Sequence, residues 1–223
     1  MKRKILSFII TIVSVVFLLI NVILLSDKPF HFHKKNDKKY FLSAIVIRDN
    51  VTPFQKIGSR IFTVPYLREK YGHYAYFTQY YKDDKKEAFT DSLYRFLNRY
   101  DSVDLYLLAH ANYYYSWLDT FPKNLLKKIR MVYNTGCGDA NQANLWLSMG
   151  VSSYIGHNGL KSQSPVFYFF FLRRITASDN IKTAVEDANL MTERFFSIFS
   201  FFYWQFSQTD LIEGTKGILY KKF

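Results

Sequence analysis

Hydrophobic and polar residues follow two kinds of pattern along most of the chain. Four continuous apolar runs have the length and composition of buried strands: 41–47, 103–109, 129–134 and 151–155. The Tyr- and Phe-rich run 73–81 is also typical of a strand. Segments with apolar residues at helical spacing lie between these runs. Such alternation predicts an α/β domain over residues 40–223, with a mostly parallel sheet and helices on both faces.

Helices are predicted at 84–100, 141–149, 164–175 and 181–191. Segment 55–71 is expected to be helical in part, because Pro65 must interrupt or begin a helix. The aromatic block 195–206 is too short to cross a membrane. We interpret it as a core helix, with an interfacial helix that docks onto the bilayer as the alternative.

The N-terminal segment has a pattern of its own. Residues 5–25 contain no charged side chain, and as a helix they would span about 30 Å, the thickness of a hydrocarbon core. Lys2, Arg3 and Lys4 precede them. Residues 1–26 are therefore predicted to be a signal anchor, a single transmembrane helix, and residues 27–39 a basic juxtamembrane linker. A cleaved signal peptide is the alternative.

The net charge of +12 is concentrated near this segment. Residues 1–39 hold eight Lys and Arg against two Asp, so they carry half of the excess. Positive residues that flank an apolar segment favour a membrane surface over nucleic acid as the partner. The basic residues before the span favour a cytoplasmic N-terminus, whereas the lysines beyond residue 25 oppose it. We nevertheless expect the domain to lie outside the cytoplasm.

The composition excludes several classes of protein. Hydrophobic residues make up 49% of the chain and charged residues 22%, so intrinsic disorder is excluded. The single cysteine, Cys137, excludes an intrachain disulfide and a Cys-rich zinc site. His31 and His33 have no third ligand nearby, and we interpret them as part of an interfacial tether. No metal site or cofactor is predicted.

His110 and Cys137 carry the candidate chemistry, because each closely follows a buried strand. Ligands of open α/β sheets bind beyond the carboxyl ends of the strands, and adjacent parallel strands would bring both residues to one edge. A thiol acts as a nucleophile when a base partners it, and imidazole titrates nearest to neutral pH. Gly136 and Gly138 would let a substrate carbonyl approach the backbone. Each residue alone is more often structural, since a lone Cys after a strand is usually a buried small residue and a lone His a satisfied polar neighbour. Only their placement at equivalent strand ends favours a function.

A family resemblance rests on the same residues. The run Asp-Leu-Tyr-Leu-Leu-Ala-His ends at His110, and Met-Val-Tyr-Asn-Thr-Gly-Cys ends at Cys137. This pattern resembles the caspase-like cysteine peptidases, a group that includes caspases, legumain, gingipain, clostripain, separase and CHAT domains. The resemblance covers about residues 40–190 and implies a caspase-haemoglobinase-like fold without a cofactor.

The resemblance also implies roles for individual residues. His110 would be the general acid and base, Cys137 the nucleophile, and the backbone N–H groups of Cys137 and Ala111 the oxyanion hole. The substrate would be a peptide or protein. The family usually has Gly where Ala111 stands, so the alternative is a catalytically silent caspase-like fold that acts as a membrane-tethered binding module.

One further histidine and three aspartates are considered for a role beside His110 and Cys137. His157 lies two residues beyond the predicted strand 151–155, so a glutaminase-like pairing with Cys137 is a second chemical hypothesis. A loop residue is the simpler interpretation. Asp104 and Asp119 are interpreted as solvent or turn carboxylates, and Asp139 has no assigned role despite its closeness to Cys137.

Overall fold

The structure is a computed structural model that describes residues 42–49, 53–110, 113–159, 162–178, 180–199 and 207–222. The chain divides into two compact units, residues 1–34 and 35–223, and every described residue belongs to the second. No helix within the described ranges is long and apolar enough to cross a membrane. The predicted anchor at 5–25, the linker at 27–39, and His31 and His33 lie outside the described residues.

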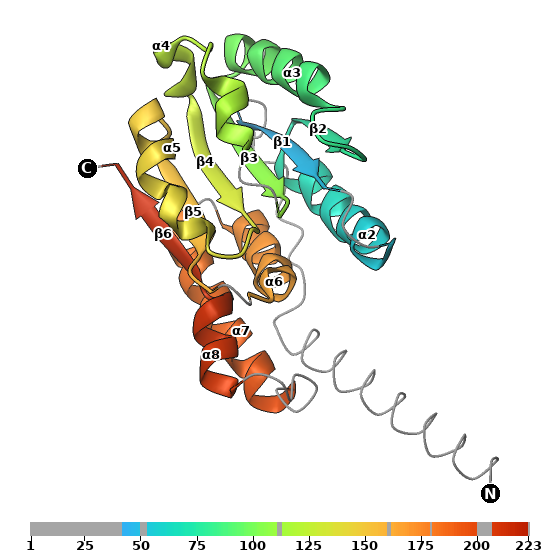
Figure 1. Ribbon diagram of the computed structural model, residues 1–223, viewed down its shortest axis with the longest axis vertical. Coiled ribbons are helices and arrows are strands. Elements are labelled where there is room, and N and C mark those ends of the chain that lie inside the picture. Colours follow the sequence, from blue (N-terminus) through green and yellow to red (C-terminus); the bar gives the residue numbers. More distant parts are fainter. Residues whose placement is uncertain are drawn as a thin grey trace, which may run out of the picture. The chain divides into compact units, whose positions relative to one another are not determined.

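A six-stranded sheet forms the centre of the domain, in the order β2-β1-β3-β4-β5-β6 (Figure 1). Its strands are β1 (Leu42–Arg48), β2 (His73–Thr78), β3 (Ser102–Leu108), β4 (Ile129–Asn134), β5 (Ser153–His157) and β6 (Gly217–Lys221). The first five strands are parallel, and β6 pairs antiparallel with β5. The prediction of an α/β fold with a mostly parallel sheet is confirmed.

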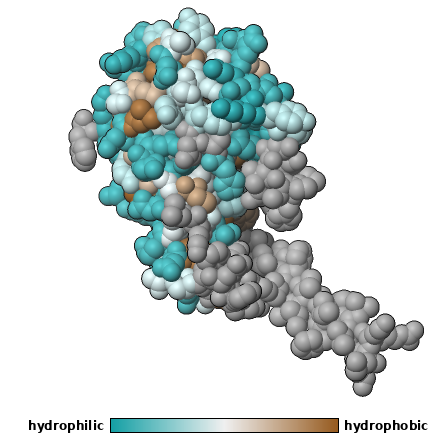
Figure 2. Space-filling view, viewed as in Figure 1, coloured by the Kyte–Doolittle hydropathy of each residue, from teal (hydrophilic) through white to brown (hydrophobic). Residues whose placement is uncertain are grey.

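Helices cover both faces of this sheet (Figure 1). They are α2 (Pro53–Lys70), α3 (Lys86–Arg99), α4 (Lys123–Leu126), α5 (Ala143–Met149), α6 (Ser164–Ala177), α7 (Ile181–Phe199) and α8 (Gln208–Thr215), with the 3₁₀ turns η2 (Tyr114–Leu118) and η3 (Asp139–Gln142). On the side seen in Figure 2, hydrophilic residues cover most of the described surface and hydrophobic ones are scattered among them.

The two faces of the sheet bury different side chains. On the α3 face, alternate strand residues such as Leu105 and Leu107 pack with Leu93 of α3 and Trp117 of η2. On the α6 face the core is aromatic, and the rings of Tyr133 and Tyr168 stack with centroids 5.4 Å apart. Part of the chain's high aromatic content therefore fills the space between the sheet and α6, and a further part, including Phe89 and Trp117, lies in the core on the α3 face.

Three elements differ from the prediction. Pro65 lies within α2 at an exposed position and neither interrupts nor begins the helix. β5 occupies 153–157 rather than 151–155, since Gly156 and His157 pair with β6, a strand that the sequence analysis did not predict. Helix α7 continues through Phe195 instead of ending before it.

Helix α7 is long because its buried stripe continues. Thr192, Phe196 and Phe199 follow Ala188 at helical spacing, and all four are buried. The interpretation of the aromatic block as part of a core helix is confirmed for the residues up to Phe199. Residues 200–206 lie outside the described residues.

Candidate functional site

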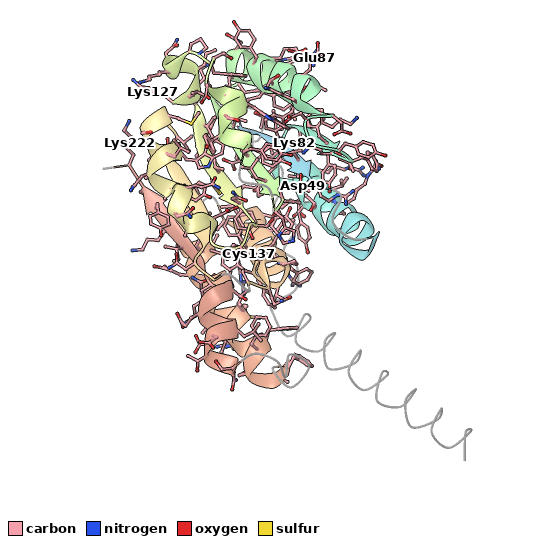
Figure 3. The ribbon with its side chains drawn as sticks, viewed as in Figure 1. Asp49, Lys82, Glu87, Lys127, Cys137 and Lys222 are labelled. Atoms are coloured by element: carbon pink, nitrogen blue, oxygen red, sulfur yellow. The ribbon has the colours of Figure 1, made fainter. Side chains whose placement is uncertain are left out.

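His110 and Cys137 follow two neighbouring parallel strands, and each lies the same number of residues beyond a pair of strand residues that are in register. Leu107 of β3 pairs in register with Asn134 of β4, and each candidate lies three residues beyond its member of that pair. Neighbouring strands are about 4.8 Å apart, so the two turns begin side by side at the carboxyl edge of the sheet. Figure 3 shows Cys137 at this edge, beyond the arrowhead of β4.

Thr135 fixes the two turns to each other. Its backbone N–H donates to the carbonyl of Leu107 at 3.0 Å. Its hydroxyl lies 3.2 Å from the same carbonyl and 3.4 Å from the carbonyl of Ala109. The segment that leads to Cys137 is therefore attached to the residue that directly precedes His110.

The turn around Cys137 is built on its two glycines. Gly138 has a φ of 72°, which glycine adopts without the steric strain of a side chain. A Cβ on Gly136 would stand 1.8 Å from Oδ2 of Asp139. Gly136 is thus required by the close packing of the Asp139 carboxylate, a reason that the sequence analysis did not foresee.

The thiol of Cys137 is half-buried and free of any disulfide. Its Sγ lies 3.8 Å from the carbonyl oxygen of Ser162, a weak contact. Ser164 extends the same connection, because its hydroxyl donates to the carbonyl of Thr135 at 2.6 Å. The chain segment that leads into α6 therefore lies against the turn that carries Cys137.

His110 is exposed at the start of the loop after β3. A His110 ring turned into the core beneath the sheet would exclude a dyad with Cys137. Because His110 is exposed, its ring is not buried there. Ala111, the other residue expected to supply an oxyanion-hole N–H, lies outside the described residues.

His157 is a core residue rather than the loop residue of the simpler interpretation. It is the last residue of β5 and is fully buried. Its Nδ1 lies 2.8 Å from the carbonyl oxygen of Thr215, to which it donates, and its Nε2 lies 3.2 Å from the hydroxyl of Tyr133. Burial lowers the pKa of His157 to about 4. Both ring nitrogens are occupied, so nothing supports the glutaminase-like pairing with Cys137.

Asp104 is likewise buried, which corrects its interpretation as a solvent or turn carboxylate. It lies within β3 at 0% exposure, and its Oδ1 accepts a hydrogen bond from Nε of Arg130 at 2.9 Å. The hydroxyl of Tyr71 donates to Oδ2 of Asp104 at 2.7 Å and lies 2.6 Å from that of Tyr106. Burial, followed by the Asp104 charge, raises the pKa values of both tyrosines.

The other two aspartates differ from each other. Asp119 is exposed at the end of η2, as interpreted. Asp139 is fully buried next to the cysteine turn, and its Oδ1 accepts a hydrogen bond from Nε2 of Gln142 at 3.3 Å. Asp139 therefore shapes the turn that presents Cys137.

A second polar cluster at the carboxyl edge escaped the sequence analysis. Asp49 follows β1 and Gln79 follows β2, and both contact Tyr114 of η2. Nε2 of Gln79 donates to Oδ1 of Asp49 at 3.3 Å and to the hydroxyl of Tyr113 at 2.5 Å. The available signal was that polar residues directly follow two strands, the same signal that identified His110 and Cys137.

Among the described residues, no three His, Cys, Asp or Glu side chains gather as a metal ion would require. Comparisons of the chain with protein-family models, with curated proteins and with solved structures find no match. Interpretation of the site therefore depends on its own geometry.

Proposed function

We propose that this protein is a membrane-anchored, single-pass cysteine endopeptidase of the caspase-like class, with its domain outside the cytoplasm. His110 and Cys137 form the dyad. The observation that carries the proposal is the register of β3 and β4, which starts both turns at neighbouring points of one edge. The exposure of His110 and the partial exposure of Cys137 are consistent with access for a peptide.

The reaction follows from the two side chains. His110 takes the thiol proton while Sγ of Cys137 attacks the peptide carbonyl carbon, and the oxyanion forms beside the N–H groups of Cys137 and Ala111. His110 then gives the proton to the leaving amine, and a thioester remains on Cys137. Water adds to the thioester as His110 takes its proton, which returns to Sγ when the acid product leaves.

Alkylation of Cys137 tests the dyad without any knowledge of the substrate. Because the thiolate is the reactive form, a partnered Cys137 should react with iodoacetamide at neutral pH much faster than the thiol of the denatured chain. His110→Ala should abolish this difference. His73→Ala is the matched control, because His73 is also exposed but begins β2 at the opposite edge of the sheet.

Hydrolysis of a peptide library separates the peptidase from the silent binding module. Cys137→Ala should remove all activity, and His110→Ala should lower it by at least about 100-fold, the usual contribution of a general acid and base. Equal alkylation of the native and denatured thiols, together with no cleavage, would favour the binding module. Ala111→Gly would then test whether the methyl group obstructs the oxyanion hole.

A further inference from the structure

Arg48 is a buried cation at the carboxyl end of β1. Only 5% of its surface is exposed. Its Nη2 donates to the hydroxyl of Thr78 at 3.3 Å, whereas its buried Nε and Nη1 have no hydrogen-bond partner among the described residues. Buried guanidinium groups are normally paired, because an uncompensated buried charge costs several kcal/mol.

The nearby acids are engaged elsewhere. Ile45 and Ile47 pack on the α3 face, so strand alternation places the side chain of Arg48 on the opposite face, with α2 and α6. Asp49 is held on the α3 face by Tyr114 and Gln79. The buried acid on the face of Arg48 is Asp104, which pairs with Arg130.

Arg48 also stands where this fold would accept a ligand. In the sheet, β2 lies on one side of β1 and β3 lies on the other. The strand order therefore reverses direction between β1 and β3. Open α/β sheets bind ligands at such a point, beyond the carboxyl ends of the strands. Arg48 pairs there with Leu108 of β3. In Figure 3 the next residue, Asp49, marks this edge at the end of β1.

The helix that follows adds to the positive potential. α2 begins at Pro53, five residues after Arg48, and is 18 residues long with no acidic residue in its first turn. The N-terminus of a helix carries a partial positive charge and unpaired N–H groups, which favour anions. Arg48 and the start of α2, the two ends of the β1–α2 connection, thus each favour a negative group.

We propose that Arg48 and the start of α2 form a binding site for an oxyanion, the carboxylate or phosphate group of a ligand. The free Nε–H and Nη1–H of Arg48 are donors of the guanidinium fork, which matches the oxygen geometry of both groups. The inference is independent of the proposed peptidase chemistry, since it requires neither His110 nor Cys137.

Thermal unfolding of the full chain in detergent tests the site. The protein is heated in Tris-chloride at fixed ionic strength with inorganic phosphate, with N-acetyl-aspartyl amide, or with N-acetyl-asparaginyl amide as the uncharged control. A ligand that binds only the folded state raises Tm. We expect a rise of at least about 2 °C with phosphate, with the aspartyl compound or with both, and none with the asparaginyl compound. A response to only one of the two identifies the oxyanion that the site binds, and a response to both shows that the site accepts either group.

Substitution of Arg48 makes the test specific. Arg48→Met should abolish the rise, and Arg48→Lys should weaken binding about tenfold because the guanidinium fork is lost. Without an anion, Arg48→Met should leave Tm unchanged or raise it, since it removes an unpaired buried charge. Arg130→Met is the matched control, because it leaves Asp104 unpaired and should lower Tm while retaining the response to anions.

Three results would overturn the proposal. The first is a Tm that responds to neither phosphate nor the aspartyl compound. The second is an anion response that persists in Arg48→Met. The third is an Arg48→Met protein that loses as much Tm as Arg130→Met, because Arg48 would then be a structural residue with partners in the folded protein. None of these results depends on the reactivity of Cys137, so they leave the peptidase proposal untouched.

Discussion

A fully buried carboxylate lies in β3, and three donors hold it. Asp104 receives hydrogen bonds from Nε and Nη2 of Arg130 and from the hydroxyl of Tyr71. Such a pair adds little net stability when both members are present, but the loss of one member leaves a buried charge unpaired. Asp104 and Arg130 therefore behave as a unit.

Arg130→Met should lower the free energy of unfolding by about 3–5 kcal/mol. The double variant Asp104→Asn/Arg130→Met should recover much of this loss, because no unpaired charge remains in the core. Urea denaturation of the single and double variants measures both effects. Additive losses in the double variant would mean that the two side chains do not act as a pair.

His157 makes the stability of the domain depend on pH. Its pKa of about 4 lies below the ordinary 6.5, so the unfolded chain binds a proton that the folded chain does not between these values. The stabilisation is complete above pH 6.5 and decreases as the pH falls to 4, by about 3 kcal/mol. Denaturation from pH 7.5 to 4.5 measures it. His157→Gln cannot be protonated and should lack this component, whereas an unchanged pH profile in that variant would contradict the assignment.

At the scale of elements, β6 is attached to α7 through one side chain. Oδ1 of Asn189 accepts from the N–H of Gly217 at 2.8 Å, and its Nδ2 donates to the carbonyl of Gly217 at 2.9 Å. A Cβ on Gly217 would stand 2.3 Å from Cζ of Phe167, so the strand starts in close contact with α6. The antiparallel edge strand thus depends on contacts from two helices.

Asn189→Ala should lower the free energy of unfolding by about 2 kcal/mol, since each lost hydrogen bond contributes about 1 kcal/mol. Asn98→Ala is the matched control, because Asn98 is exposed and its side chain bonds only a carbonyl within α3. That variant should stay within about 0.5 kcal/mol of the parent protein. Equal effects of the two substitutions in urea denaturation would show that Asn189 does not hold β6 in place.

The central strands were predictable because their apolar runs are continuous and end at polar residues. The same ends located His110 and Cys137 at the carboxyl edge of the sheet. Asp104 was misinterpreted because its burial depends on Arg130 of the neighbouring strand, and a linear pattern does not contain the register of two strands. The extent of β5 and the burial of His157 depend on β6, which lies about 60 residues farther along the chain. Arg48 escaped notice for the same reason, since neither its burial nor its missing partners can be read from its neighbours in sequence.

At the scale of the whole molecule, the charge and the apolar residues are unevenly distributed. The N-terminal 39 residues carry half of the net charge around an uncharged segment of 21 residues. The remaining chain supplies a sheet with helices on both faces, an arrangement that buries its own apolar surface. The proposed membrane attachment through residues 5–25 should therefore be separable by mutation from the fold of the domain.

Val15→Arg places a charge near the centre of the predicted span, where a membrane helix is destabilised by about 2.5–3.5 kcal/mol. This variant should leave the membrane fraction during an alkaline carbonate wash, whereas the parent protein and a His33→Arg variant in the linker should remain.

Mass spectrometry of the parent protein should find Met1 or Lys2 at its N-terminus, because an anchor is not cleaved. A mature chain that begins near Ser26 or Asp27 and stays in solution would instead identify residues 1–25 as a cleaved signal peptide. The domain would then be released from the membrane, and a peptidase dyad at its carboxyl edge would act on soluble substrates.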